Sequence, residues 1–199
     1  MPDAASLSPA RHLVLVGYRG SGKSTIGKLV ARLLGLDYLD TDLLIQEKSS
    51  KSIREIFANS GEEAFRDMET AVLQDLTTRK ALPASVVATG GGMIMRPENQ
   101  KLIKKLGLVV WLEVSPEMAT ARINADTLTA GQRPALTDSS LADEVERMIS
   151  LRNPVYAELA DITIKNNAVD QSADDIADEL ISQIRPTPWY SSFEKRFDS

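Results

Sequence analysis

The chain has 199 residues, of which 43% are hydrophobic and 26% are charged, so it can bury a core and does not have the composition of a disordered protein. It contains no cysteine, which excludes disulfide bridges, thiolate metal sites and a cysteine nucleophile. Acidic residues outnumber basic ones by 28 to 23, which argues against a nucleic-acid-binding protein. The sequence has neither a membrane-span-like apolar run nor a signal-peptide pattern. We therefore expect a cytoplasmic protein that binds neither membranes nor nucleic acid.

Short apolar runs alternate with longer segments of helical periodicity, which is typical of βα units on a parallel sheet. In the first half of the chain, the strand candidates are 12–16, 37–40 and 86–89. Helical spacing marks residues 24–34. Two S-x-x-E capping boxes, at Ser52 and Ser60, predict that one helix begins at each, the second reaching about residue 80.

The second half of the chain continues the alternation. Its expected elements, in order, are a helix at 97–106, a strand at 108–114, a helix from Pro116, a helix at 143–157, a strand at 161–165 and a helix at 170–184. Residues 124–138 lack periodicity and predict a mobile loop, and Pro154 is expected to kink or end its helix. The whole pattern predicts an α/β, three-layer fold with a five-stranded parallel sheet.

We expect residues 1–185 to form one domain and residues 186–199 to form a C-terminal tail. The prolines Pro186 and Pro188 break the chain before this tail. Its four aromatic side chains could dock on the domain, but a disordered end is an equal alternative.

The strongest motif is GYRGSGKST at 17–25, which matches the phosphate-binding pattern G-x-x-x-x-G-K-[ST] between a strand and a helix. The glycines let backbone N–H groups turn toward phosphate oxygens, and the helix N-terminus adds unpaired donors. The Lys23 ammonium would bind the β- and γ-phosphates, and the Ser24 hydroxyl would ligate Mg²⁺. The nucleotide-binding candidates are Gly20, Ser21, Gly22, Lys23, Ser24 and Thr25.

A pair of carboxylates, Asp40 and Asp42, follows the second strand candidate. Residues two apart in extended backbone point to one face, about 7 Å between Cα atoms, so both could enter a cleft beside the phosphate loop. One could hold Mg²⁺, and the other could accept a proton from an attacking hydroxyl. The alternative is that Asp42 only caps the helix at 43–48.

Three consecutive glycines, Gly90, Gly91 and Gly92, come directly after the third strand candidate. They cost backbone entropy and contribute no packing, so they suit a place where backbone approaches a ligand. Strand ends of open α/β sheets are where ligands bind. A flexible connector is the alternative.

Three arginines are weaker candidates. Arg66 and Glu69 lie three apart on one predicted helix, which is the spacing of an ordinary surface ion pair. Arg133 lies in the aperiodic segment, and Arg152 lies late in the next helix. Spacing alone favours solvated side chains for all three.

The ordered set of motifs resembles the shikimate kinase family, small P-loop kinases of the nucleoside-monophosphate-kinase type. The similarity spans residues 13–184 and includes GYRGSGKST at 17–25, LDTD at 39–42, SIREIF at 52–57, GEEAFRDME at 61–69, TGGG at 89–92, QRPAL at 132–136 and RNPVY at 152–156. It implies ATP-dependent phosphorylation of the 3-hydroxyl of shikimate, on the route to chorismate and aromatic amino acids. It also implies a substrate-binding region at 42–80 and a lid at 122–138.

The resemblance assigns roles on both sides of the reaction. Lys23 and the lid residue Arg133 would bind the transferring phosphate, while Ser24 and Asp40 would place Mg²⁺. Asp42 would orient or deprotonate the acceptor hydroxyl. The residues around the acceptor would be Arg66 and Arg152 on the carboxylate, Glu69 behind Arg66, and Gly90, Gly91 and Gly92 lining the site.

We expect the protein to be a monomer. Two other functions stay open. A sister kinase, such as a gluconate kinase, would use the same phosphate loop on a linear sugar acid. A non-catalytic module that senses shikimate would bind both ligands without transfer, although the presence of Lys23, Asp42 and Arg133 argues against it.

Overall fold

The structure, a computed structural model, describes residues 12–79, 82–125, 140–168 and 171–194. Its sheet has the strand order β2-β3-β1-β4-β5, and every neighbouring pair is parallel. The strands are β1 (His12–Val16), β2 (Asp37–Asp40), β3 (Ser85–Ala88), β4 (Gly107–Glu113) and β5 (Ile162–Lys165). The prediction of a five-stranded parallel sheet is confirmed, with strand bounds that differ by a residue or so.

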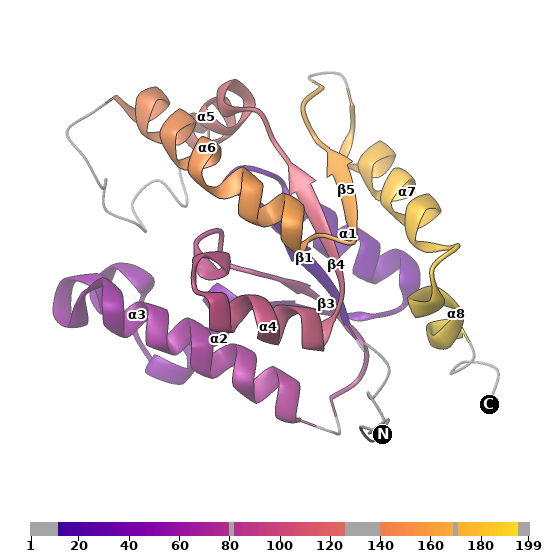
Figure 1. Cartoon of the computed structure of the whole chain (residues 1–199), viewed down its shortest axis with the longest axis horizontal. Coiled ribbons are helices and arrows are strands. Elements are labelled where there is room, and N and C mark those ends of the chain that lie inside the picture. The colour runs from indigo at the N-terminus through magenta and orange to yellow at the C-terminus, as the bar shows by residue number, and fades with distance from the viewer. Residues whose placement is uncertain (1–11, 80–81, 126–139, 169–170, 195–199) are drawn as a thin grey trace, which may run out of the picture.

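Helices cover both faces of this sheet, which makes the three layers that the sequence predicts (Figure 1). One face carries α1 (Lys23–Leu34), α7 (Ala173–Ile184) and the short α8 (Pro188–Glu194). The other face carries α2 (Thr41–Ser49), α3 (Ile53–Thr78), α4 (Pro97–Leu106), α5 (Pro116–Ala125) and α6 (Leu141–Leu159), with the 3-10 turn η1 (Met93–Met95).

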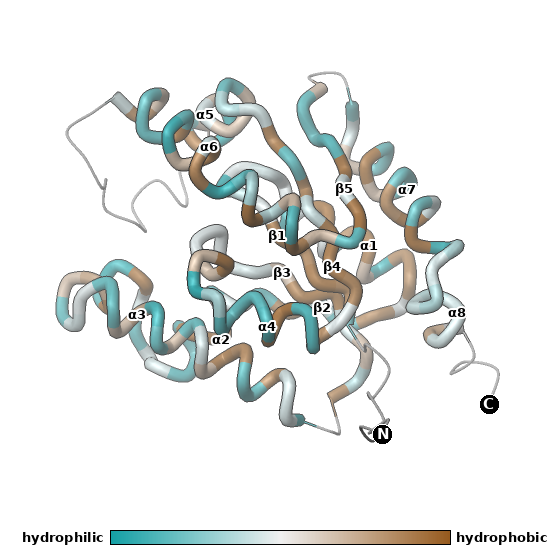
Figure 2. Tube along the Cα trace, viewed as in Figure 1, coloured by the Kyte–Doolittle hydropathy of each residue, from teal (hydrophilic) through white to brown (hydrophobic). Residues whose placement is uncertain are grey.

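The central strand β1 shows how the core is divided. Leu13 and Leu15 pack with α1 and α7, whereas Val14 and Val16 pack on the opposite face, and all four are fully buried. A strand covered on both faces has to be a continuous apolar run, which is why HLVLV has no polar alternation. Figure 2 shows the hydrophobic strands enclosed by helices with hydrophilic outer faces. Among the described helices, none combines the length and apolarity needed to cross a bilayer.

Two helices, α3 and α6, each contain a residue that disfavours helical structure. In α3, Gly61 has non-helical dihedral angles (φ 79°, ψ 176°), so a kink separates two helical segments, in line with the two predicted starts. Ser52 and Glu55 form the expected capping box at the first start. Of the two expectations for Pro154, a kink or an end of the helix, the end is wrong, because α6 continues to Leu159. Its apolar face, buried against β4, outweighs the one backbone bond that proline removes.

The C-terminal segment docks on the domain as far as residue 194. Trp189 and Phe193 of α8 are stacked with ring centroids 5.6 Å apart, and both are buried. Trp189 joins the core cluster that α1 and α7 share with the sheet. The described part of the tail is therefore docked on the domain and is not a disordered end.

Most of the expected lid at 122–138 lies outside the described residues, because the description stops at Ala125 and resumes at residue 140.

This docking predicts that Trp189→Ala lowers the free energy of unfolding by about 2 kcal/mol, the value of one large buried apolar side chain. Urea denaturation measures the change, and Ser191→Ala at an exposed position of α8 is the control. If both variants were as stable as the unaltered chain, α8 would not contribute to the core.

Candidate active site

A cleft of about 400 Å³ opens at the carboxyl ends of the strands. Its walls are the loop after β1, the carboxylates after β2 and the glycines after β3. The structure therefore brings together three motifs that are far apart in the sequence, at the edge where open parallel sheets bind ligands. The predicted site residues that line the cleft are Gly20, Gly22, Lys23, Ser24, Thr25, Asp40, Asp42, Gly90 and Gly91.

The phosphate loop wraps around the Lys23 ammonium. Lys23 Nζ donates to the carbonyl oxygens of Gly17 at 2.8 Å and Tyr18 at 2.9 Å. Gly20 (φ 79°) and Gly22 (φ 90°) have left-handed backbone, which other residues rarely adopt and which lets the loop curl inward. Ser21 is fully buried below the loop. Lys23 begins α1, so the unpaired N–H groups of the first helical turn sit beside its charge.

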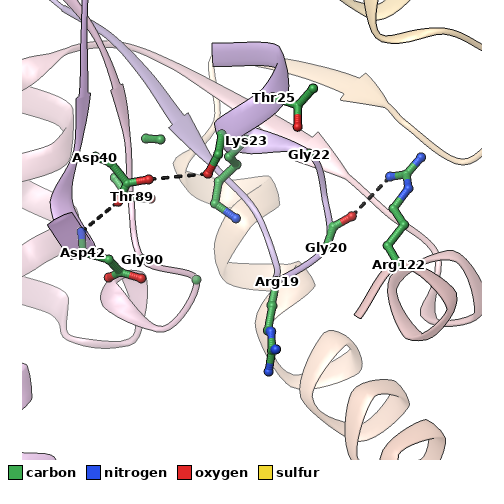
Figure 3. A pocket seen from close by; sticks show the side chains of 13 residues that line it. Arg19, Gly20, Gly22, Lys23, Thr25, Asp40, Asp42, Thr89, Gly90 and Arg122 are labelled. Carbon is green, nitrogen blue, oxygen red and sulfur yellow. Dashed lines mark hydrogen bonds between the residues drawn. The ribbon is translucent and has the colours of Figure 1, made fainter. Parts of the chain in front are cut away.

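Both aspartates line the cleft, as the sequence indicated, but they do not share an extended strand, and the alternative that Asp42 caps the helix is wrong. Asp40, the last residue of β2, is the helix cap: its Oδ1 accepts from the backbone N–H groups of Asp42 at 2.9 Å and Leu43 at 3.4 Å. Asp42 lies in the first turn of α2 and not in extended backbone. Capping by Asp40 directs the Asp42 carboxylate into the cleft, opposite Lys23 (Figure 3).

The second oxygen of Asp40 faces Ser24. Asp40 Oδ2 accepts from Ser24 Oγ at 3.4 Å and from Tyr38 Oη at 3.1 Å. Burial raises the pKa of the Tyr38 hydroxyl, and the charge of Asp40 raises it further, so Tyr38 remains a hydrogen-bond donor. A hydroxyl and a carboxylate thus meet at one point of the cleft.

The glycine turn is packed against charged side chains and is not a flexible connector. A Cβ atom on Gly90 would lie 2.7 Å from Asp42 Oδ1 and 3.1 Å from Glu69 Oε1. The Gly90 N–H donates to the buried hydroxyl of Thr41 at 3.0 Å. Any larger residue here would push the Asp42 carboxylate out of place.

Arg66 contacts the other end of this turn. A Cβ atom on Gly92 would lie 2.7 Å from Arg66 Nη1, and the guanidinium pairs with Glu69 and Glu62, each at 2.8 Å. The Glu69 side chain is 0% exposed and that of Arg66 is 16% exposed, so the expectation of a surface ion pair is wrong. Burial opposes the charge on Arg66, but Glu69 and Glu62 outweigh it, and the pKa of Arg66 is raised.

Arg152 reaches the glycine turn from α6. It is 8% exposed, and its Nη1 donates to the Gly91 carbonyl at 3.2 Å. Its guanidinium lies over the Tyr18 ring at 5.5 Å, while the Tyr156 hydroxyl also donates to Gly91 at 2.5 Å. The buried Nε of Arg152 has no hydrogen-bond partner within the described residues. The expectation of a solvated arginine is therefore wrong.

Two residues of the site had no role in the sequence interpretation. Asn166, directly after β5, is buried, and its Nδ2 donates to the Ser21 carbonyl at 3.0 Å. Arg122 on α5 donates to Asn166 Oδ1 at 3.0 Å and to the Gly20 carbonyl at 3.2 Å. Burial lowers the pKa of Arg122. The position of Asn166 immediately after a predicted strand was the available signal.

Arg19 is a third site residue to which the sequence interpretation gave no role. It belongs to the phosphate loop and lines the cleft. Gly92, the last residue of the glycine turn, does not line the cleft itself, and neither do Arg66 and Arg152, which contact the turn. Arg133 lies outside the described residues.

Similarity to known proteins shows the family of the chain. The family model "Shikimate kinase" matches residues 19–185. The chain belongs to the shikimate kinase family. A shikimate kinase of Rhodopirellula baltica is 43% identical over 171 residues, which cover 86% of this chain and 89% of the relative.

Solved structures of shikimate kinases have the same fold. The shikimate kinase of Acinetobacter baumannii, in complex with shikimate, superposes with a TM-score of 0.76 at 37% identity and covers 87% of this chain and 92% of its own. A gluconokinase of Sinorhizobium meliloti has a TM-score of 0.55 at 15% identity, covers 94% of this chain and 96% of its own, and shows a shared fold alone.

Proposed function

We propose that this chain transfers the γ-phosphoryl group of ATP to the 3-hydroxyl of shikimate, on the route to chorismate and aromatic amino acids. The observation that carries the proposal is the set of charged groups around the glycine turn, which lies beside the phosphate loop. The Asp42 carboxylate lies at Gly90, and guanidinium groups lie at Gly91 and Gly92. Membership of the shikimate kinase family supports it, as does a relative solved with shikimate.

The phosphate loop would hold ATP. Phosphoryl transfer depends on alignment and charge neutralisation more than on covalent help. Lys23 would exchange its contacts with the Gly17 and Tyr18 carbonyls for the terminal phosphates, and the N–H groups around Gly20, Ser21, Gly22, Ser24 and Thr25 would surround them. Arg133, by its place in the family motif, would add positive charge at the transferring group.

Mg²⁺ would bind at Ser24 and Asp40. The fit rests on the donor set: a hydroxyl and a carboxylate oxygen 3.4 Å apart on the cleft wall are hard ligands of the kind this cation takes. Within the described residues, no three His, Cys, Asp or Glu side chains gather into a metal site. Mg²⁺ commonly keeps several waters and uses substrate phosphates, so it needs few protein ligands. When bound, it would neutralise charge on the phosphates.

The acceptor would bind through its carboxylate and its hydroxyls. Arg66 and Arg152 suit the carboxylate because planar guanidinium groups bind carboxylates in bidentate geometry. Glu69 would hold Arg66 in place. Asp42 would take the proton of the 3-hydroxyl as that oxygen forms a bond to the γ-phosphorus and the bond to ADP breaks. The glycines give the ring room to approach the backbone.

A coupled assay of ADP release tests the proposal with shikimate and gluconate as alternative acceptors. We expect release with shikimate and Mg²⁺ and little release with gluconate. Activity on gluconate alone would overturn the choice of acceptor. Binding of ATP and shikimate without transfer in a single turnover would favour a sensor.

The contact of Asn166 with the phosphate loop predicts an effect on nucleotide binding. Asn166→Ala should raise the Kd for ADP about tenfold, because one buried hydrogen bond to the loop carbonyl is lost. Calorimetric titration with ADP measures it. The control is Asn167→Ala, since Asn167 is exposed and instead accepts from the Ser115 N–H at 2.6 Å. Equal ADP affinity in both variants would exclude a role for Asn166 in shaping the loop.

We infer that the enzyme works as a monomer, because one chain supplies both the cleft residues Lys23 and Asp42 and the arginines that contact its glycine turn. Sedimentation equilibrium tests this, and a stable dimer would contradict it. Because ATP is a metabolite of the cytoplasm, we place the reaction there. Fractionation of the source cells, followed by detection of the chain with an antibody, tests this location.

A further inference from the structure

A buried polar bridge joins α3 to the turn that follows the glycines. Asn99, in the first turn of α4, is 0% exposed, and Thr70 on α3 is 8% exposed. The Thr70 hydroxyl donates to Asn99 Oδ1 at 2.8 Å, and Asn99 Nδ2 donates to the Met93 carbonyl at 3.0 Å. Both polar atoms of the amide are therefore used to connect two separate elements.

The two ends of this bridge lie beside Arg66, one of the proposed acid-binding residues, and beside its neighbour Gly92. Thr70 is one helical turn beyond Arg66, and its hydroxyl oxygen lies 3.1 Å from the Arg66 carbonyl oxygen. Met93 immediately follows Gly92, which packs against the Arg66 guanidinium so closely that a Cβ atom would come within 2.7 Å of it. The bridge thus runs alongside the contact between Arg66 and Gly92 and fixes the same spacing.

Other contacts in this region are less specific. Arg96 pairs across the same gap with Glu63 and with Asp67, the latter at 2.8 Å, but both acidic side chains are largely exposed. Exposed ion pairs contribute little and tolerate displacement. A buried, fully used amide is far more sensitive to geometry, because any shift leaves polar atoms without partners.

We propose that Thr70 and Asn99 are positioning residues for the substrate acid. They hold α3 and the glycine turn at one separation, and this separation sets how well Arg66 meets the carboxylate of the acceptor. The inference rests on the proposed function, in which Arg66 binds that carboxylate. The bridge contacts neither the phosphate loop nor Lys23, so it acts on acceptor binding and not on ATP binding.

Thr70→Val tests the bridge because valine keeps the branched shape and removes only the hydroxyl. We expect the KM for shikimate to rise about tenfold, in line with the loss of one buried hydrogen bond, while the KM for ATP changes by less than about twofold. Thr70→Ser keeps the donor and should restore the shikimate KM to within about threefold of the unaltered enzyme.

A matched control separates positioning from stability. Ser85, also fully buried, donates to the Pro83 carbonyl at 2.9 Å at the far end of β3. Ser85→Ala should lower the Tm without changing either KM. If Thr70→Val lowered the Tm but left the shikimate KM within about twofold of the unaltered value, the bridge would be structural only and the proposal would be wrong.

A variant that does not fold and a failure of the proposed function can each be told apart from a failure of the bridge. If Thr70→Val does not fold, Asn99→Ser makes the same test, because serine is too short to reach Thr70 and Met93 together, and an unchanged shikimate KM would again overturn the bridge. If the unaltered chain releases no ADP with shikimate, the proposed function fails, whatever the variants show.

Discussion

Asp42→Asn should lower kcat for shikimate phosphorylation by about 10²–10⁴-fold, the usual contribution of a positioned proton acceptor. The amide has nearly the shape of the carboxylate, so the contact with Gly90 is preserved. What it loses is the ability to take the proton of the acceptor hydroxyl. Because Asp42 lies across the cleft from Lys23, the Kd for ADP should change by less than about twofold.

Single-turnover transfer and ADP titration together measure this prediction. Asp37→Asn is the matched control, since Asp37 is exposed at the opposite end of β2. It should leave both quantities unchanged. A near-normal kcat in Asp42→Asn would show that Asp42 does not serve as the base and only orients the acceptor.

Arg66→Ala should raise the KM for shikimate about 10²-fold, because truncating one partner of a desolvated charge pair costs about 2–5 kcal/mol. The neighbouring Glu69 carboxylate is 0% exposed, so it would be left buried without this cation and would repel the substrate acid. Arg66→Lys retains the charge but not the planar fork, and an intermediate KM is expected.

Steady-state kinetics with shikimate varied at saturating ATP check the effect. Arg54→Ala, at an exposed position of the same helix, is the control and should have the unaltered KM. If Arg66→Lys and Arg66→Ala both kept that KM, Arg66 would belong to the fold and not to the substrate site. The lysine variant maintains this test even if the alanine variant is unstable.

The strands and the phosphate loop could be predicted because their determinants are local. HLVLV is followed within six residues by three glycines with positive φ, Gly17, Gly20 and Gly22, and both faces of the strand are buried. The capping box at Ser52 likewise lies within four residues. In such segments, local preference and tertiary packing favour the same structure.

The arginines could not be placed from spacing. Arg66 and Glu69 are three residues apart whether the helix faces solvent or the protein, and only the packing of α3 against the glycine turn buries them. The same holds for Arg152, which is covered because Tyr18, from the opposite end of the sequence, lies beneath it. Their assignment from sequence depended on the family resemblance.

Asp40 and Asp42 show a different limit. The sequence indicated a shared face, but the helix begins at Thr41, two residues earlier than the pattern suggested, and Asp40 takes the capping position. The register of a helix start depends on which side chain can accept the first N–H groups, and two aspartates in D-T-D compete for that position.

The most direct test of the account is a crystal structure of the chain with ADP, Mg²⁺ and shikimate. We expect the phosphates within the loop around Lys23, the shikimate carboxylate on Arg66 and Arg152, and its 3-hydroxyl on Asp42. Shikimate bound away from the glycine turn, with Arg66 and Arg152 out of contact with it, would contradict the claim that both substrates meet in this cleft.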